Sequence, residues 1–168
     1  MSIISKDISK AITLLTNHQL VAIPTETVYG LAGNIYSEKA IKAIFETKKR
    51  PFFNPLIVHI PSVEMLSHIV DYIPKKAQLL ADAFWPGPIT LVLKKKPIIP
   101  NLITAGKDTV AVRVPNHATT LANYIEFFIA NNKASNFTDS VQRGMDLAFY
   151  NSLLKLSIKT IYLKPYVK

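Results

Sequence analysis

The sequence predicts an α/β protein in which helices pack around a twisted, mixed, open sheet. Segments with helical apolar spacing alternate with short β-rich segments along the 168 residues, which is typical of a helix-covered sheet. Two of the β-rich segments, 89–93 and 109–114, lie close together in the sequence and so favour a mixed sheet. The length fits a single domain over 1–168 with a substantial core.

The first two expected elements are a helix and a strand. Apolar residues recur at helical spacing over residues 5–17, which predicts an opening helix. The short apolar run 20–23, closed by Pro24, is typical of a buried strand.

A second helix is expected to begin after Ser37, whose hydroxyl can cap it. It must end near Arg50, because Pro51 disfavours helical geometry in the residue before it. The apolar run 56–60 then predicts the next strand.

The following elements are two helices and a turn. One helix is expected over 62–69, with Ser62 as its cap, and another over 74–84, with a proline in its first turn. The sequence Trp-Pro-Gly-Pro at 85–88 is a turn signal. A further helix is expected to start near Ala118.

The composition favours anionic partners. Lys and Arg total 20 against 11 Asp and Glu, giving a net charge of +9, which suits nucleotides, RNA or acidic proteins, or simply a solvated basic surface. The absence of cysteine excludes disulfides and thiolate metal sites. No apolar run reaches the roughly 20 residues of a membrane span, and the N-terminus lacks signal-peptide features. We therefore expect a cytoplasmic location and no membrane partner.

The first candidate site is the segment Pro-Thr-Glu-Thr-Val-Tyr-Gly, residues 24–30. It follows a predicted strand, and ligands of open α/β sheets bind beyond the carboxyl ends of strands. The hydroxyls of Thr27 and Tyr29 can donate or accept hydrogen bonds, as a polar small molecule requires. Threonine hydroxyls can also close a turn, and Tyr29 can also belong to the core.

The second candidate is Lys-Lys-Arg-Pro-Phe-Phe-Asn-Pro-Leu-Ile-Val-His, residues 48–59. Lys48 offers a compact charge and Arg50 a planar fork, a pair suited to polyphosphate oxygens. Two prolines stiffen the backbone that follows, Asn54 adds an amide, and His59 stands at a strand end. The alternatives are a solvated helix terminus, where cations favour the helix dipole, and a structural histidine.

The third candidate is the strand within residues 104–117. Alternation puts Thr109 and Arg113 on the face opposite the valines. An arginine inside an apolar strand is costly unless an anion pairs with it. That anion can be a ligand carboxylate or phosphate, or a protein carboxylate such as Glu26.

Four motifs occur in order: PTETVYGLAG, KKRPFFNPLIVHI, FWPGPITLVLKKK and TAGKDTVAVRVPNH. Together they closely resemble the YrdC-like family of threonylcarbamoyl-AMP synthases, over about residues 1–125. The resemblance implies a nucleotidyltransferase that joins L-threonine, bicarbonate and ATP into threonylcarbamoyl-adenylate and releases pyrophosphate. It also implies a twisted, mixed open sheet with helices around a basic concave surface.

The resemblance further implies partners. A partner transferase passes the threonylcarbamoyl group to the adenosine beside the anticodon of tRNA, and family members are described as binding tRNA or double-stranded RNA. ATP is expected as a substrate together with Mg²⁺, and no residue is assigned as a metal ligand.

Carried over position by position, the resemblance gives each candidate a role. Lys48 and Arg50 match the Lys-x-Arg pair of the family and are the expected catalytic residues. The residues expected to bind L-threonine are Thr27, Tyr29, His59 and Arg113. The residues expected to bind ATP are Lys48, Arg50, Asn54, Thr109 and Ser135.

The resemblance ends after about residue 125, and residues 126–168 are expected to be a diverged or truncated C-terminal part. The family's Ser-x-Asn loop has no intact counterpart, and Ser135 is the nearest substitute for its serine. Helical spacing over 141–155 and a β-rich run at 160–163 predict one further helix and strand.

The alternative function is a non-catalytic RNA- or nucleotide-binding module of the same family, which the net charge of +9 and the C-terminal departure favour. A third reading is a carbamoyl-adenylate domain resembling those of hydrogenase maturation factors. Those domains sit in long chains with acylphosphatase and zinc modules, neither of which this sequence contains.

Overall fold

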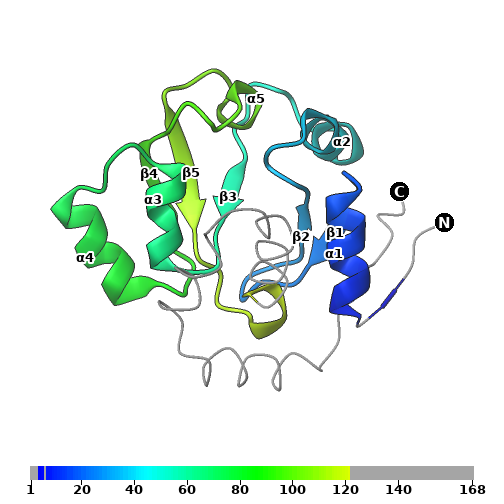
Figure 1. Cartoon of the computed structure of the whole chain (residues 1–168), viewed down its shortest axis with the longest axis horizontal. Helices are drawn as coiled ribbons and strands as arrows, with labels where there is room; N and C mark the ends of the chain where they lie inside the picture. The colour runs from blue at the N-terminus through cyan, green and yellow to red at the C-terminus, as the bar shows by residue number, and fades with distance from the viewer. Residues whose placement is uncertain (1–3, 6, 122–168) are drawn as a thin grey trace, which may run out of the picture. The chain divides into compact units, whose positions relative to one another are not determined.

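The computed structural model describes residues 4, 5 and 7–121 (Figure 1). Their contacts divide into two compact units. One contains the described residues up to Ala32 together with those from His117, and the other contains Gly33–Asn116. Within the described residues, no helix is long and apolar enough to cross a membrane.

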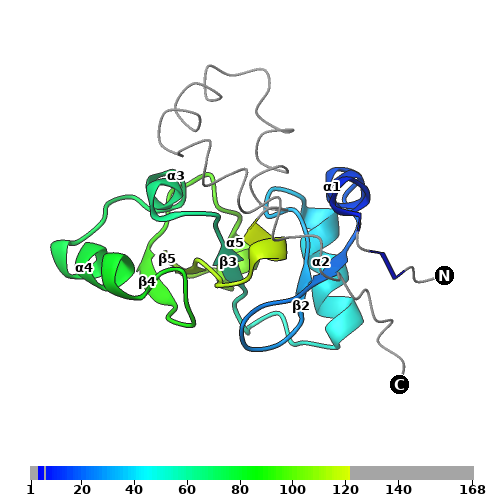
Figure 2. The ribbon, with the colours of Figure 1, turned by 90° about the horizontal axis from the view of Figure 1, so that it is seen from below.

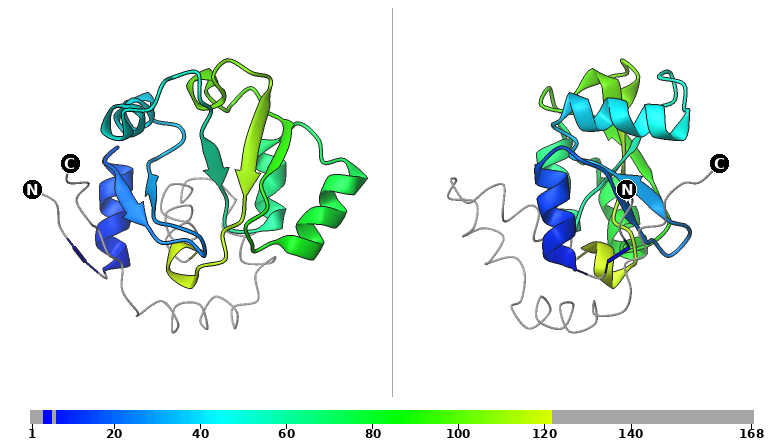
Figure 3. Two further views of the ribbon diagram at one scale, coloured as in Figure 1. Left: turned by 180° about the vertical axis from the view of Figure 1, so that it is seen from behind. Right: turned by 90° about the vertical axis from the view of Figure 1, so that its right-hand side faces the viewer.

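The first unit is built on a helix and a β-hairpin. Helix α1 (Ile8–Thr16) precedes strands β1 (Val21–Ile23) and β2 (Gly30–Ala32), which pair antiparallel. Figure 3 shows α1 beside β1. The two are joined by an apolar cluster whose buried members are Ala11, Leu15, Val21 and Ile23. Residues 118–121 of this unit are also helical, as expected near Ala118.

The second unit contains the larger sheet. Its strands are β3 (Ile57–His59), β4 (Leu91–Lys94) and β5 (Thr109–Arg113), in the order β3-β5-β4. Strand β3 runs parallel to β5 whereas β4 runs antiparallel to it, so the predicted mixed sheet is confirmed.

The second unit also contains helices. They are α2 (Glu38–Lys48), the 3₁₀ turn η1 (Val63–Met65), α3 (Leu66–Ile69), α4 (Lys75–Phe84) and α5 (Asn101–Thr104). Figures 1 and 2 show α3 and α4 beside β4 and β5. The valines of β5 are fully buried, and α2 buries its apolar stripe, in which Phe45 is 1% exposed. The α/β class predicted from the pattern is thus confirmed.

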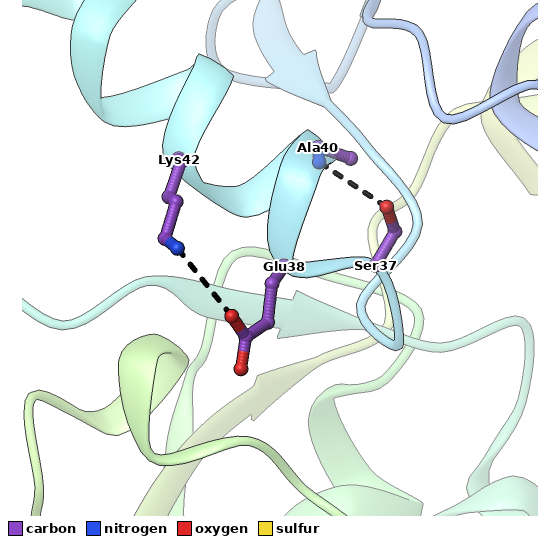
Figure 4. Close-up of polar contacts among 4 residues, drawn as sticks. All are labelled: Ser37, Glu38, Ala40 and Lys42. Carbon is purple, nitrogen blue, oxygen red and sulfur yellow. Dashed lines mark hydrogen bonds and ion pairs between the residues drawn. The ribbon is translucent and has the colours of Figure 1, made fainter.

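The second helix begins as its sequence predicts. The Ser37 hydroxyl accepts a hydrogen bond from the Ala40 amide at 3.2 Å, and one turn later Lys42 pairs with Glu38 at 3.4 Å (Figure 4). Ser62 differs, because its side chain makes no capping hydrogen bond and the chain enters a 3₁₀ turn instead. The prediction that Ser62 caps the third helix was therefore wrong.

Two short elements were not expected from the sequence, namely β2 and α5. Each is only three or four residues long and is held by bonds to other parts of its unit. The expectations for the helix at 141–155, the strand at 160–163 and Ser135 lie outside the described residues.

Candidate functional site

In the first unit, the loop from Pro24 to Tyr29 joins β1 to β2 and is closed by the hydroxyl of Thr25. The Thr25 Oγ1 accepts from the amides of Thr27 (3.2 Å) and Val28 (3.1 Å) and donates to the Val28 carbonyl (2.6 Å). It also lies 3.0 Å from the Thr27 hydroxyl. The possibility that a threonine closes a turn here is confirmed, and Thr27 and Tyr29 lie exposed on the loop.

The start of this loop is anchored from a distant part of the same unit. The hydroxyl of Thr120 donates a hydrogen bond to the carbonyl of Pro24, and Pro24 is buried. Thr120 is in turn placed by its helical turn, because its amide donates to the carbonyl of His117 at 3.0 Å. The loop entrance is therefore fixed by packing and by a long-range hydrogen bond.

His117 is partly buried, and it interacts electrostatically with Glu26 of this loop. Its Nδ1 is buried and has no hydrogen-bond partner in the part of the chain that the structure describes. Burial lowers the pKa of His117, and the nearby carboxylate of Glu26 partly opposes that shift. The fold thus favours the neutral imidazole at this position.

In the second unit, the Lys48–Arg50 segment forms the C-terminus of α2. The amides of Lys49 and Arg50 donate to the carbonyls of Glu46 (3.1 Å) and Phe45 (2.9 Å), which is the Schellman arrangement. Lys49 takes a left-handed conformation with φ of 49°. The helix ends at Lys48, so the expected stop near Arg50 is confirmed.

The guanidinium of Arg50 organises the loop that leads into β3. Its Nε donates to the carbonyl of Asn54 at 3.3 Å and its Nη2 to the carbonyl of Pro55 at 2.8 Å. The backbone amide of Asn54 donates to the backbone carbonyl of Pro51 at 3.1 Å, which tightens the same loop. Arg50 is therefore half-buried and directed along the loop, whereas Lys48 is exposed and has no ion-pair partner among the described residues.

The candidates on the larger sheet share one face. Thr109 and Arg113 are alternate residues of β5, and Arg113 lies directly across from His59 of the parallel strand β3. Ala111 lies between Thr109 and Arg113 in β5 and pairs with Ile57 and Val92, whose side chains are exposed. The valines of β5 point to the opposite, buried face. The predicted alternation along this strand is confirmed.

Arg113 is 9% exposed, and a backbone carbonyl orients its guanidinium. Its Nε donates to the carbonyl of Gly87 at 3.1 Å, and the Gly87 amide donates to Val114 at 2.8 Å. Gly87 sits in the turn that contains the cis peptide bond Trp85–Pro86. A Cβ at Gly87 would lie 2.3 Å from the carbonyl oxygen of Phe84, so only glycine fits without a backbone shift.

The structure places Arg50 and Asn54 in one loop and His59, Thr109 and Arg113 on one face of the larger sheet. The sequence indicated all five as candidates. It missed Thr25, Gly87 and Thr120 as residues that hold the candidates in place. The glycine in Trp-Pro-Gly-Pro was the signal for Gly87, whereas nothing local marks Thr120. No group of three His, Cys, Asp or Glu suited to a metal ion occurs within the described residues.

Comparison with known proteins places the chain in a family. The family model named Sua5_yciO_yrdC and described as "Telomere recombination" matches residues 13–130. Since that match covers more than half of the 168 residues, the chain belongs to the Sua5/YciO/YrdC family. The resemblance inferred from the four motifs is thus confirmed.

Individual relatives are similar over part of the chain. The threonylcarbamoyl-AMP synthase of Pyrococcus abyssi is 56% identical over 103 residues, covering 61% of this chain and 30% of that protein. That of Bacillus subtilis is 47% identical over 116 residues, covering 68% and 34%. The crystal structure of P. abyssi Sua5 complexed with L-threonine matches with a TM-score of 0.68 and 52% identity, covering 71% and 35%. The chain thus spans about a third of the length of these relatives.

Proposed function

We propose that the chain is a threonylcarbamoyl-AMP synthase, which joins L-threonine, bicarbonate and ATP and releases pyrophosphate, for threonylcarbamoyladenosine modification of tRNA. The observation that carries the proposal is the 56% identity over 103 residues to a protein of that name. The P. abyssi relative at 52% identity, whose structure holds L-threonine, supports the same substrate.

We assign L-threonine to Arg113, Thr27, Tyr29 and His59. Arg113 supplies a charged donor suited to a carboxylate, and its Nε bond to Gly87 leaves the rest of the planar fork oriented. The guanidinium is 9% exposed, so an ion pair with the substrate carboxylate forms in a poorly solvated environment, where it is stronger than in water.

We assign ATP to Lys48, Arg50, Asn54, Thr109 and Ser135. The exposed ammonium of Lys48 is available to phosphate oxygens, and two backbone carbonyls orient the guanidinium of Arg50 two residues later. Mg²⁺ commonly binds through substrate phosphates, so it would come with the triphosphate and would supply charge neutralisation there. We name no protein ligand for it.

The proposed chemistry has two steps. The threonine amine adds to bicarbonate, giving an N-linked carbamate and water. A carbamate oxygen then forms a bond to the α-phosphorus of ATP, and the bond to the β-phosphate oxygen breaks with pyrophosphate as the leaving group. Lys48 and Arg50 stabilise the negative charge that develops on the transferring and leaving phosphates, so no covalent enzyme intermediate is needed.

Pyrophosphate release from ATP tests this proposal. The full chain should release pyrophosphate only when both L-threonine and bicarbonate are present. Replacing Lys48 by alanine should lower the rate by about 10²–10³-fold, because it removes a charge that stabilises the transition state. Lys49→Ala is the matched control, since it removes an adjacent exposed charge outside the Lys-x-Arg pair. Folded protein without threonine-dependent release would refute the proposal.

Direct RNA binding is a second candidate function, which the net charge of +9 favours. Phe52 and Phe53 have exposed rings and follow Lys48 and Lys49 closely in the sequence, so they offer stacking surfaces in a positively charged segment. Affinity for tRNA should then fall steeply with salt, because phosphate contacts release counterions. A salt-independent affinity would contradict it.

We further infer a threonylcarbamoyl transferase as the partner that consumes the adenylate, because an acyl adenylate is hydrolytically reactive and needs an acceptor. Cytoplasmic action follows from the same proposal, since ATP and the tRNA acceptor are available there. A pull-down of the transferase dependent on substrates would test the partnership.

A further inference from the structure

Helix α4 has the reverse of the usual arrangement of small and large apolar residues. Its buried residues are Ala77 and Ala81. Its large apolar side chains lie outward instead, with Leu79 60% exposed, Leu80 43% and Phe84 51%. A surface helix normally turns its large apolar side chains to the core, and a contiguous exposed apolar patch marks an interaction site. The outer side of α4 is therefore a candidate docking surface.

The exposed apolar residues of α4 adjoin one another on the helix. Leu80 and Phe84 are four positions apart and Leu79 precedes Leu80, so the three occupy neighbouring positions over two turns. We call this set, Leu79, Leu80 and Phe84, the outer stripe. In Figures 1 and 2, α4 lies at the outer edge of its unit, with one side turned away from the sheet. A partner can therefore approach that side of the helix.

Two opposite charges flank Leu79 along the helix. Lys75 lies four positions before Leu79 and Asp82 three positions after it, so the three residues line up on one side of α4. Both charged residues are exposed, and neither forms an ion pair within the residues that the structure describes. Gln78 donates a hydrogen bond to one oxygen of Asp82 at 2.7 Å, which holds the carboxylate in place. The outer side of α4 thus carries a positive, an apolar and a negative residue in order.

The stability of the isolated helix does not explain the position of Lys75. The first turn of α4 contains Lys75 and Lys76 and no acidic residue. The N-terminus of a helix carries partial positive charge, so cations at that end are unfavourable. A carboxylate supplied from outside the helix would offset this repulsion.

We propose that the outer stripe binds the outer stripe of a second copy of this chain, with the two α4 helices antiparallel. A two-fold axis at Leu79 brings the two Leu79 side chains together at the centre of the contact. Lys75 of each copy then lies at the level of Asp82 of the other, because the midpoint between positions 75 and 82 falls beside position 79. The same symmetric contact therefore joins apolar groups to apolar groups and each ammonium to a carboxylate.

The charges specify both the direction and the identity of the partner. A parallel pair would place Lys75 against Lys75 and Asp82 against Asp82, and like charges facing one another are unfavourable. An unrelated partner would need the same two charges in reverse order around an apolar residue, which a second copy supplies by symmetry. Because α4 has ten residues and is about 15 Å long, the contact is small and the dimer is reversible.

Sedimentation velocity of the full chain tests the proposal, at concentrations of about 1–200 µM and a salt concentration of about 0.15 M. The average mass should rise from that of one chain toward that of two. Lys75→Glu and Asp82→Lys should each weaken the dimer by about tenfold, because either change turns both symmetric pairs into like charges. The double variant exchanges the charges and should restore the affinity to within about threefold of wild type.

Two further variants separate the stripe from the fold and from general apolar exposure. Leu79→Glu places a charge at the centre of the contact and should abolish the dimer, while its exposed position leaves the core intact. Ile98→Glu is the matched control, since Ile98 is 59% exposed outside α4, and it should leave the dimer unchanged. Circular dichroism of each variant verifies that the fold is retained.

A wild-type chain that stays monomeric over the whole concentration range would overturn the inference, whether residues beyond 121 or another protein cover the stripe. A dimer that persists in folded Leu79→Glu would also overturn it. So would charge reversals whose combination gives no recovery. The proposed synthase activity does not depend on any of these outcomes.

Discussion

The guanidinium of Arg113 is oriented by the carbonyl of Gly87, which accepts a hydrogen bond from its Nε at 3.1 Å. The two residues are 26 positions apart, and the Gly87 amide is bonded to the residue after Arg113. The Trp-Pro-Gly-Pro turn thus acts on the sheet by holding one arginine in place. Its glycine is required because a side chain there would meet the Phe84 carbonyl.

Gly87→Ala should therefore destabilise the protein and weaken L-threonine binding together. Forcing a Cβ to within 2.3 Å of a backbone oxygen requires the turn to shift, at a cost of about 1–3 kcal/mol. Gly30→Ala is the matched control, because a Cβ there meets no atom within 4 Å. Urea denaturation measures the difference, and equal effects of the two substitutions would contradict this role for Gly87.

Replacing the two serines at helix starts by alanine should change the free energy of unfolding by different amounts. Ser37→Ala should lower the free energy of unfolding by about 1 kcal/mol, since it leaves the Ala40 amide without its cap. Ser62→Ala should change it by less than about 0.5 kcal/mol, because the Ser62 side chain makes no capping bond. Denaturant midpoints report both, and a comparable loss for Ser62→Ala would count against the observed difference.

These serines also show what the sequence could and could not predict. Both precede an apolar pattern and look alike locally, but only Ser37 leads directly into an α-helix, whereas Ser62 leads into a 3₁₀ turn. The long elements followed from periodicity and the mixed sheet from spacing. The short β2 and α5 did not, because three or four residues carry too little pattern and depend on partners elsewhere.

The sequence likewise indicated only some residues of the candidate site. Residue chemistry identified Arg113 and its neighbours on β5, because an arginine among buried valines is conspicuous. Thr120 was not identified, because its bond to Pro24 spans 96 positions and nothing around it marks a contact. Hydrogen-bond directions at Thr25 likewise depend on backbone geometry that no sequence pattern specifies.

Replacing Lys49 by glycine should stabilise the protein. Lys49 has a φ of 49°, a left-handed conformation that costs a residue with a Cβ about 1 kcal/mol and glycine almost nothing. Thermal unfolding should therefore shift upward in Lys49→Gly. Lys39→Gly, at an exposed position inside α2, should shift it downward. A decrease in Lys49→Gly would show that the Schellman ending does not govern stability here.

The stability of the protein should fall as the pH drops below about 6.5, partly because of His117. Burial lowers the pKa of His117 in the fold, against an opposing contribution from Glu26. Above the pKa of His117 in the unfolded chain, the imidazole is neutral in both the folded and the unfolded state, so it causes no loss of stability. As the pH falls toward the lowered folded pKa, only the unfolded chain takes up the proton, and stability is lost.

His117→Gln cannot titrate and should reduce the loss of unfolding free energy between about pH 7 and pH 5. Part of the loss should remain, because burial and Lys96 also lower the pKa of His68. His18→Asn is the control, since His18 is exposed with a φ of 60°, which asparagine tolerates. An identical pH dependence in wild type and His117→Gln would contradict the role of this buried imidazole.

The central claim, synthesis of an amino-acid adenylate, is tested most directly by identifying the product. The full chain is incubated with ATP, Mg²⁺, L-threonine and ¹³C-labelled bicarbonate, and the quenched mixture is analysed by mass spectrometry. The account predicts threonylcarbamoyl-AMP that carries the heavy carbon, absent without threonine. Unchanged ATP and threonine in the presence of folded protein would contradict it.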